Sequence, residues 1–193
     1  MRKGMPIAVT GPSGVGKRVL IEYVRNVMPE CDLSVSATTR PPRDGEVDGR
    51  EYHFLTREEF ERRIAAGRFF EYKPYAGNLY GTPLDELEKR LAQGITVFVE
   101  VEVQGAKVFK EKMPEAHTIF ISPPEPALEV LRKRIIGRGK VPDNLEERLA
   151  TSVEELKEVG FFDHHIVNDD LGVAKSGMLE LVQKILREYR QAA

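Results

Sequence analysis

Glycines and one lysine near the N-terminus are spaced as in a loop that binds phosphate. Seven consecutive residues follow the pattern G-x-x-x-x-G-K: Gly11, Pro12, Ser13, Gly14, Val15, Gly16 and Lys17. The glycines let backbone N–H groups turn toward an anion, and Lys17 can reach the β- and γ-phosphates of a nucleotide. Because an apolar run precedes the motif and a helical pattern follows it, we interpret it as an ATP-binding loop, not as an incidental glycine-rich turn.

The two residues after this loop depart from the usual pattern. The motif normally continues with Ser or Thr, whose hydroxyl binds Mg²⁺, but Arg18 and Val19 follow here. Neither side chain coordinates a metal; Arg18 either points to solvent or lies near a phosphate as an extra positive charge. We expect a working site in which Mg²⁺ is held by phosphates, waters and an acid elsewhere, with no direct protein ligand assigned. The alternative is an impaired site, because losing such a partner costs about 1–3 kcal/mol.

A second group of cations follows in the segment 34–52. Arg40 and Arg43 are three residues apart, and Pro41 and Pro42 keep the chain between them extended. Two arginines in this arrangement can converge on one phosphate through charge-assisted hydrogen bonds. Either arginine alone would be read as an ordinary surface residue. The pair is more informative because Tyr52 follows it.

A scaffold must position these groups, and the apolar pattern indicates which one. Nearly continuous apolar runs, typical of strands buried on both faces, occupy residues 6–10, 95–101, 117–121 and 165–167. Helical patterns lie between and after them, at residues 17–28, 83–93, 105–112, 124–136, 145–159 and 171–189. This alternation predicts an α/β fold with a P-loop NTPase-type parallel sheet flanked by helices.

Two segments interrupt the alternation. Residues 33–82 contain turns, short strands at 52–54 and 69–73, and one helix opened by a capping box of Thr56 and Glu59. We expect an inserted mixed α/β region here, which would bind a nucleoside monophosphate, within a single domain whose core is 1–32 and 83–193. Residues 137–147 are polar and contain glycine, as in a short mobile lid.

The motifs together resemble those of guanylate kinases, which are P-loop nucleoside monophosphate kinases. The resemblance runs from residue 11 to residue 170, and its most specific part is the run T-T-R-x-P-R-x-G-E-x-x-G-x-x-Y at 38–52. Further matching pieces occur in order at 70–71, 77–82, 100–105 and 137–139. The resemblance implies transfer of the γ-phosphoryl group of ATP to GMP, with Mg²⁺ as cofactor and dGMP as a further candidate acceptor.

The same resemblance assigns an acceptor site. The side chains implied to hold the GMP phosphate are Arg40, Arg43, Tyr52 and Tyr80. Glu71 is implied to read guanine, because a carboxylate accepts hydrogen bonds from both the ring N1–H and the exocyclic amino group, which adenine does not offer. The hydroxyls of Ser36 and Thr82 are implied to complete this recognition. A site built on such polar partners rejects analogues that lack them.

An acid follows the apolar run at 95–99. Glu100 stands where the end of a parallel strand beside a P-loop can present a carboxylate to a metal-bound water or to the acceptor nucleotide. We group it with the GMP-binding residues. Glu102 could do the same work, and the sequence does not separate the two.

Arginines around the predicted lid would supply further positive charge. Arg134 and Arg138 are one helical turn apart on the same face, and Arg148 belongs to the next helix. The resemblance implies that these three, with Lys17, are the catalytic cations that neutralise charge on the transferring group. It also implies that Asn168 lies near the adenine of the donor.

Composition limits the other classes of function. The chain has 193 residues, 29 basic and 31 acidic, for a net charge of −2, which predicts neither nucleic acid nor membrane as a partner. No apolar run approaches the roughly 20 residues of a membrane span. A single cysteine, Cys31, suits a cytoplasmic protein. His164 and His165 are adjacent, so their side chains diverge on a strand and do not predict a metal site.

A binding module is the alternative to an enzyme. Guanylate-kinase-like domains that bind protein partners and have lost catalysis are known, and the residues after Lys17 raise that question here. The retention of Lys17 with the arginines of both predicted sites favours the kinase. The sequence carries no signature of the oligomeric state.

Overall fold

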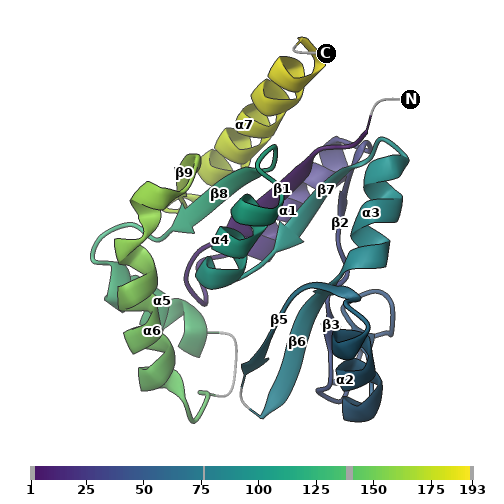
Figure 1. Cartoon of the computed structure of the whole chain (residues 1–193). Coiled ribbons are helices and arrows are strands. Elements are labelled where there is room, and N and C mark those ends of the chain that lie inside the picture. The colour runs from purple at the N-terminus through teal and green to yellow at the C-terminus, as the bar shows by residue number, and fades with distance from the viewer. Residues whose placement is uncertain (1–2, 76, 138–140, 192–193) are drawn as a thin grey trace.

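A five-stranded parallel sheet lies at the centre of the structure (Figure 1). The computed structural model describes residues 3–75, 77–137 and 141–191. In spatial order the strands are β2 (Cys31–Leu33), β7 (Thr96–Glu100), β1 (Pro6–Thr10), β8 (His117–Ser122) and β9 (His164–Val167). All four neighbouring pairs are parallel. Because β1 is the middle strand, the loop that follows it emerges at the centre of the sheet's C-terminal edge.

Helices cover both faces of this sheet. The buried side chains of Ile7 and Val9 pack with those of α1 (Lys17–Val27) and α7 (Leu171–Gln191). Ala8, which points the other way, belongs to a second core with α3 (Leu84–Ala92) and α4 (Val103–Lys112). Burial on both faces explains why the strands read as continuous apolar runs. The predicted parallel sheet flanked by helices is confirmed.

A smaller sheet of mixed direction is built from the segment between β2 and α3. Its strands, in spatial order, are β4 (His53–Phe54), β3 (Ala37–Thr38), β6 (Asn78–Pro83) and β5 (Phe69–Tyr75). Strands β3 and β4 are parallel, whereas the other two pairs are antiparallel. Helix α2 (Arg57–Ala65) covers it, with the ring of Phe60 stacked on that of Phe69 at 4.3 Å between centroids. The predicted cap is formed, because the Glu59 N–H donates to the Thr56 hydroxyl at 3.1 Å.

Two helices, α5 (Ala127–Ile136) and α6 (Leu145–Lys157), stand beside the sheet on the side of β8 and β9 (Figure 1). Most predicted helix boundaries shift by one to three residues. The helix expected at 105–112 begins at Val103, the one at 124–136 begins after Pro126, and the one at 145–159 ends at Lys157 before a short 3₁₀ turn (Val159–Phe161). Proline has no N–H to donate within a helix, which fits its position just before α5.

The predicted lid is only partly described. Gly137 ends α5 and residues 141–144 lead into α6, whereas residues 138–140, and with them Arg138, lie outside the described residues. Within the described ranges, no helix is both long and apolar enough to cross a membrane.

Candidate nucleotide-binding cleft

The glycine-rich loop joins β1 to α1 and is shaped by three glycines with positive φ. The φ angles are 133° at Gly11, 85° at Gly14 and 100° at Gly16, a region that other residues rarely adopt. The Lys17 ammonium lies over the loop and donates to the carbonyls of Gly11 at 2.5 Å and Pro12 at 3.2 Å. The loop, the lysine and the start of α1 are thus arranged as an anion-binding nest.

Gly11 is required for more than its backbone angle. A Cβ at this position would lie 2.1 Å from the carbonyl oxygen of Ile121 on β8, which is backbone and cannot move aside. We expect Gly11→Ala to lower the melting temperature by roughly 5–10 °C, from the cost of a strained residue in a chain of this size. Gly160→Ala is the matched control, because its Cβ would meet nothing within 4 Å. Thermal unfolding that is equal for the two variants would contradict this packing.

The loop opens into one cleft that continues to the smaller sheet. Residues predicted for both sites line it together: Gly11, Ser13, Gly14, Gly16, Lys17, Arg18, Ser36, Arg40, Arg43, Tyr52, Glu71, Tyr80, Glu100 and Arg148. Thr82 is buried directly behind the lining residue Glu71. The residues predicted for a donor site and those predicted for an acceptor site therefore line one continuous cleft.

Arginine and tyrosine side chains gather at the β3 end of the cleft. Arg40 is largely buried, and its guanidinium lies 5.5 Å from the centroid of the Tyr52 ring. The Tyr52 and Tyr80 rings meet edge to face at 6.0 Å between centroids. Glu46, which the sequence reading did not single out, accepts from the Arg40 guanidinium at 2.9 Å and from the Arg43 backbone at 2.7 Å. Glu46 thereby holds the segment that carries both arginines.

Glu71 presents a buried carboxylate to the same cleft. Its Oε1 accepts from the Thr82 hydroxyl at 2.8 Å. Burial raises the pKa of Glu71, against a smaller lowering by the Thr82 hydrogen bond and the Lys73 charge. Helix α4 packs close to it: a Cβ at Gly105 would lie 3.6 Å from this carboxyl group, at van der Waals distance, and 3.2 Å from the Val101 side chain. A partly desolvated carboxylate with one oxygen already oriented can accept hydrogen bonds from a ligand edge.

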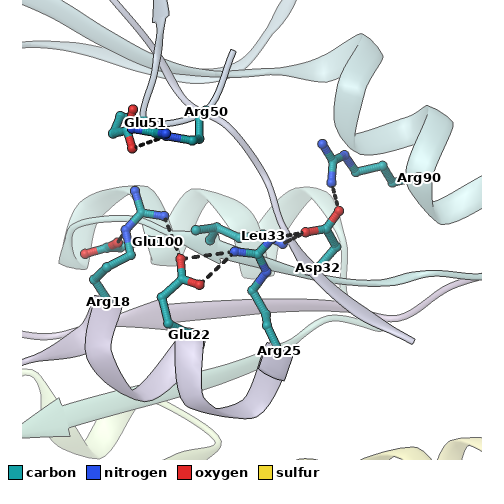
Figure 2. A network of polar contacts seen from close by, with 9 residues as sticks. All are labelled: Arg18, Glu22, Arg25, Asp32, Leu33, Arg50, Glu51, Arg90 and Glu100. Carbon is teal, nitrogen blue, oxygen red and sulfur yellow. Dashed lines mark hydrogen bonds and ion pairs between the residues drawn. The ribbon is translucent and has the colours of Figure 1, made fainter. Parts of the chain in front are cut away.

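Arg18 turns into the cleft and pairs with Glu100 at the end of β7. Figure 2 shows its guanidinium between two carboxylates, with Nε 3.3 Å from Glu100 and Nη1 3.8 Å from Glu22. Arg18 lines the cleft with its side chain 42% exposed, and its place near a phosphate stays a prediction. Glu102, the other acid considered for this role, pairs with Lys73 instead.

Three charged residues in the cleft were missed or left unassigned. Lys73 forms an ion pair with Glu102. Burial raises the pKa of Glu155 on α6, and the nearby charges of Lys17 and Lys73 lower it by a smaller amount. Burial lowers the pKa of Lys73. Spacing could have found two of them. Lys73 is two residues from Glu71 on one strand, and Glu155 is seven residues from Arg148 on one helix.

The arginines assigned to catalysis have different surroundings. Arg148 lines the cleft, and its Nε is buried with no hydrogen-bond partner among the described residues. The Nη1 of Arg134 is likewise buried without a partner among those residues, while its Nη2 donates to the Asn168 carbonyl at 2.8 Å. Arg138 lies outside the described residues. A buried guanidinium donor with no partner is what a phosphate oxygen would satisfy.

Asn168 is placed behind the loop. Its side chain is buried and donates to the Val15 carbonyl at 2.8 Å. The expected place of this residue near the donor's adenine stays a prediction, and the structure adds the contact between its side-chain amide and the backbone of the glycine-rich loop.

Several carboxylates line the cleft and could contact a metal ion. The described residues contain no group of three or more His, Cys, Asp and Glu side chains that could hold an ion. The cleft carboxylates Glu100 and Glu102 are paired with Arg18 and Lys73. Mg²⁺ takes oxygen ligands and keeps several waters, so two carboxylates at the cleft fit an ion that binds together with nucleotide phosphates.

The fold and the cleft define a P-loop protein of the phosphotransferase type, with a carboxylate and arginines facing the phosphate loop. The guanylate kinase family model matches residues 3–188, so the chain belongs to this family. The chain is 48% identical to a guanylate kinase of Rubrobacter xylanophilus, covering 96% of this chain and 97% of the relative. It is 46% identical to one of Synechocystis sp., covering 93% and 94%. The crystal structure of guanylate kinase from Anaplasma phagocytophilum matches with a TM-score of 0.73 and 31% identity, covering 98% of this chain and 87% of that one.

Proposed function

We propose that this chain transfers the γ-phosphoryl group of ATP to GMP, giving ADP and GDP. The observation that carries the proposal is that Lys17 and Glu71 line one cleft. The lysine belongs to a loop that binds triphosphates, and the carboxylate faces the region where a guanine edge can be read. Membership of the guanylate kinase family supports the same activity.

At the donor end, the glycine-rich loop and Lys17 hold the β- and γ-phosphates. Lys17 exchanges its contacts with the Gly11 and Pro12 carbonyls for phosphate oxygens. Arg148 and Arg134 offer donors that lack partners among the described residues, and Arg138 is assigned with them from the sequence. Asn168 supports the loop through Val15. Positive charge then surrounds the group that moves.

At the acceptor end, the smaller sheet and α2 form the GMP-binding region. Arg40, Arg43, Tyr52 and Tyr80 bind the GMP phosphate, and Ser36 contributes to the base site. Glu71 accepts hydrogen bonds from N1–H and the amino group of guanine, while Thr82 fixes one carboxylate oxygen. A nucleotide with adenine offers neither of these donors in the same place, so it loses the recognition.

Transfer then requires positioning, not a covalent intermediate on the protein. An oxygen of the GMP phosphate attacks the γ-phosphorus in line, and the bond from that phosphorus to the bridging oxygen of ADP breaks. Mg²⁺ carried by ATP supplies neutralisation of phosphate charge when bound. Glu100 and Glu102 are the carboxylates that would contact its waters.

ATP and GMP are the proposed small-molecule partners, with dGMP as a second acceptor, since no contact that we assign involves the 2′-hydroxyl. With a single cysteine the chain has no internal disulfide, which supports a cytoplasmic setting. That thiol, Cys31, is buried, and burial raises its pKa to about 12, so it is unreactive at neutral pH.

A coupled assay of ADP formation with different acceptors tests the proposal. With ATP and Mg²⁺, kcat/KM for GMP should exceed that for AMP or UMP by about 10⁴-fold, as for a site whose buried polar groups lose their partners. The value for dGMP should lie close to that for GMP. Turnover with GMP that does not exceed the background without acceptor would exclude the proposed reaction.

A further inference from the structure

Arg18 stands where the phosphate-loop pattern has a metal-binding hydroxyl. It is the second residue of α1, so its backbone lies at the helix N-terminus beside the loop. The side chain lines the cleft and is 42% exposed, which leaves its guanidinium within reach of a ligand. A charge has therefore replaced a neutral ligand at the position next to Lys17.

The guanidinium lies between the donor and acceptor ends of the cleft. Its Nε is 3.3 Å from Glu100, which ends the strand adjacent to the loop (Figure 2). Burial raises the pKa of Tyr52, the charge of Glu100 raises it further, and the charge of Arg18 opposes them. Arg18 and Glu100 thus both lie near a residue assigned to the GMP phosphate. The phosphates of the two nucleotides must meet in this region for transfer to occur.

The contact with Glu100 is one that a phosphate can displace. It uses a single nitrogen, and both side chains are partly exposed to water, where such ion pairs contribute little net stability. The second partner, Glu22, is 3.8 Å away, beyond hydrogen-bond distance. A phosphate group carries more charge than a carboxylate and matches the guanidinium fork with two oxygens.

We propose that Arg18 is a substrate-binding residue that exchanges Glu100 for phosphate oxygens when nucleotide enters the cleft. This inference rests on the proposed function. In the usual motif a hydroxyl at this position helps to hold Mg²⁺, and the ion neutralises phosphate charge. Here the Arg18 guanidinium supplies part of that neutralisation itself. The exchange also releases the Glu100 carboxylate toward the acceptor or toward the waters of the ion.

Calorimetric titration with AMP-PNP, an ATP analogue with nitrogen bridging its β- and γ-phosphates, tests this exchange in EDTA and in Mg²⁺. In EDTA, Arg18→Ser should raise Kd by roughly tenfold or more, the effect of losing a charge-assisted hydrogen bond to phosphate. Arg18→Lys should retain part of the affinity. Added Mg²⁺ should lower the Kd of Arg18→Ser for AMP-PNP by a larger factor than it lowers the Kd of the unaltered protein.

The matched control is Arg25→Ser, on the same helix. Arg25 pairs with Glu22 and Asp32 outside the cleft, so its loss removes the same charge and should change Kd less than twofold. Glu100→Gln should tighten AMP-PNP binding in EDTA, because it frees Arg18. Melting temperatures of all variants separate binding from folding.

Equal affinities of Arg18→Ser and Arg25→Ser in EDTA would overturn the inference and leave the kinase assignment standing. If Arg18→Ser instead binds as tightly as the unaltered protein but melts lower, Arg18 is only a structural partner of Glu100. Failure of the unaltered protein to bind either AMP-PNP or GMP in Mg²⁺ would overturn the proposed function itself, and the inference with it.

Discussion

Replacing Lys17 with methionine is expected to lower kcat by about 10³-fold, the scale found when a charged group that stabilises transferring phosphate is removed. In the structure the ammonium bridges the carbonyls of Gly11 and Pro12, directly over the loop that is proposed to hold the triphosphate. Methionine keeps the length and the apolar stem but removes the charge. The loss should fall on kcat more than on the KM for GMP.

Steady-state ADP release, with thermal unfolding alongside, measures this effect. Lys184→Met is the matched control. Lys184 is an exposed residue of α7 that does not line the cleft, and it pairs with Glu188 on the same helix. The control should keep full activity. A Lys17→Met variant that retains more than a tenth of the normal kcat would show that the loop does not act on the transferred group.

Replacing Glu71 with glutamine is expected to lower kcat/KM for GMP by about 10²-fold or more, because one or two hydrogen bonds to a charged acceptor are lost. Glutamine has nearly the same shape, but its amide group presents a donor to a guanine edge that also donates. It can still accept from the Thr82 hydroxyl. The selectivity for GMP over AMP should collapse at the same time.

Stability separates base reading from a structural role for Glu71. Burial raises the pKa of this carboxyl group, so its charged form disfavours the folded state and its replacement should not lower the melting temperature at neutral pH. Glu61→Gln is the control, because Glu61 is an exposed residue of α2 that pairs with Arg57. Unchanged kcat/KM for GMP in Glu71→Gln would remove Glu71 from the base site.

The raised pKa of Glu71 also gives a pH dependence with a definite sign. Only the ionised carboxylate accepts from both guanine donors, so GMP affinity should weaken as the pH falls through this pKa. The contribution of this group to folding stability runs the other way and is lost as the pH rises. Titration of the GMP phosphate affects the unaltered protein and Glu71→Gln alike, so it cancels when their GMP affinities are compared across pH. Only the unaltered protein should lose additional GMP affinity as the pH falls.

The main sheet could be predicted because its strands are buried on both faces and its helices are amphipathic. The smaller sheet could be predicted only in outline. Strand β3 has two residues and exists because β4 and β6 pair with it, not because of its own pattern. Strand β6 contains Gly81 and Pro83, which are poor strand formers, and it is held by its pairing with β5. Such elements depend on tertiary partners.

The candidate site likewise has a part that local sequence patterns predict and a part that depends on tertiary packing. The glycine-rich loop and the arginine segment are local patterns, and the structure brings Lys17, Arg40 and Glu71 to one cleft. The grouping of Lys73 with Glu155 depends on how the smaller sheet and α6 sit across the cleft, which no local pattern encodes. Asn168 shows the opposite limit. The family resemblance implies a place for it near adenine, whereas its contact with the Val15 carbonyl follows only from packing.

Phosphorus-31 NMR of the protein mixed with equal amounts of ATP and GMP and with Mg²⁺ tests the assignment most directly. We predict that the ATP γ-phosphate and GMP signals fall together, while ADP and GDP appear in equal amounts without inorganic phosphate. Inorganic phosphate forming while the GMP signal stays constant would contradict phosphoryl transfer to GMP, as would the absence of any change in either nucleotide.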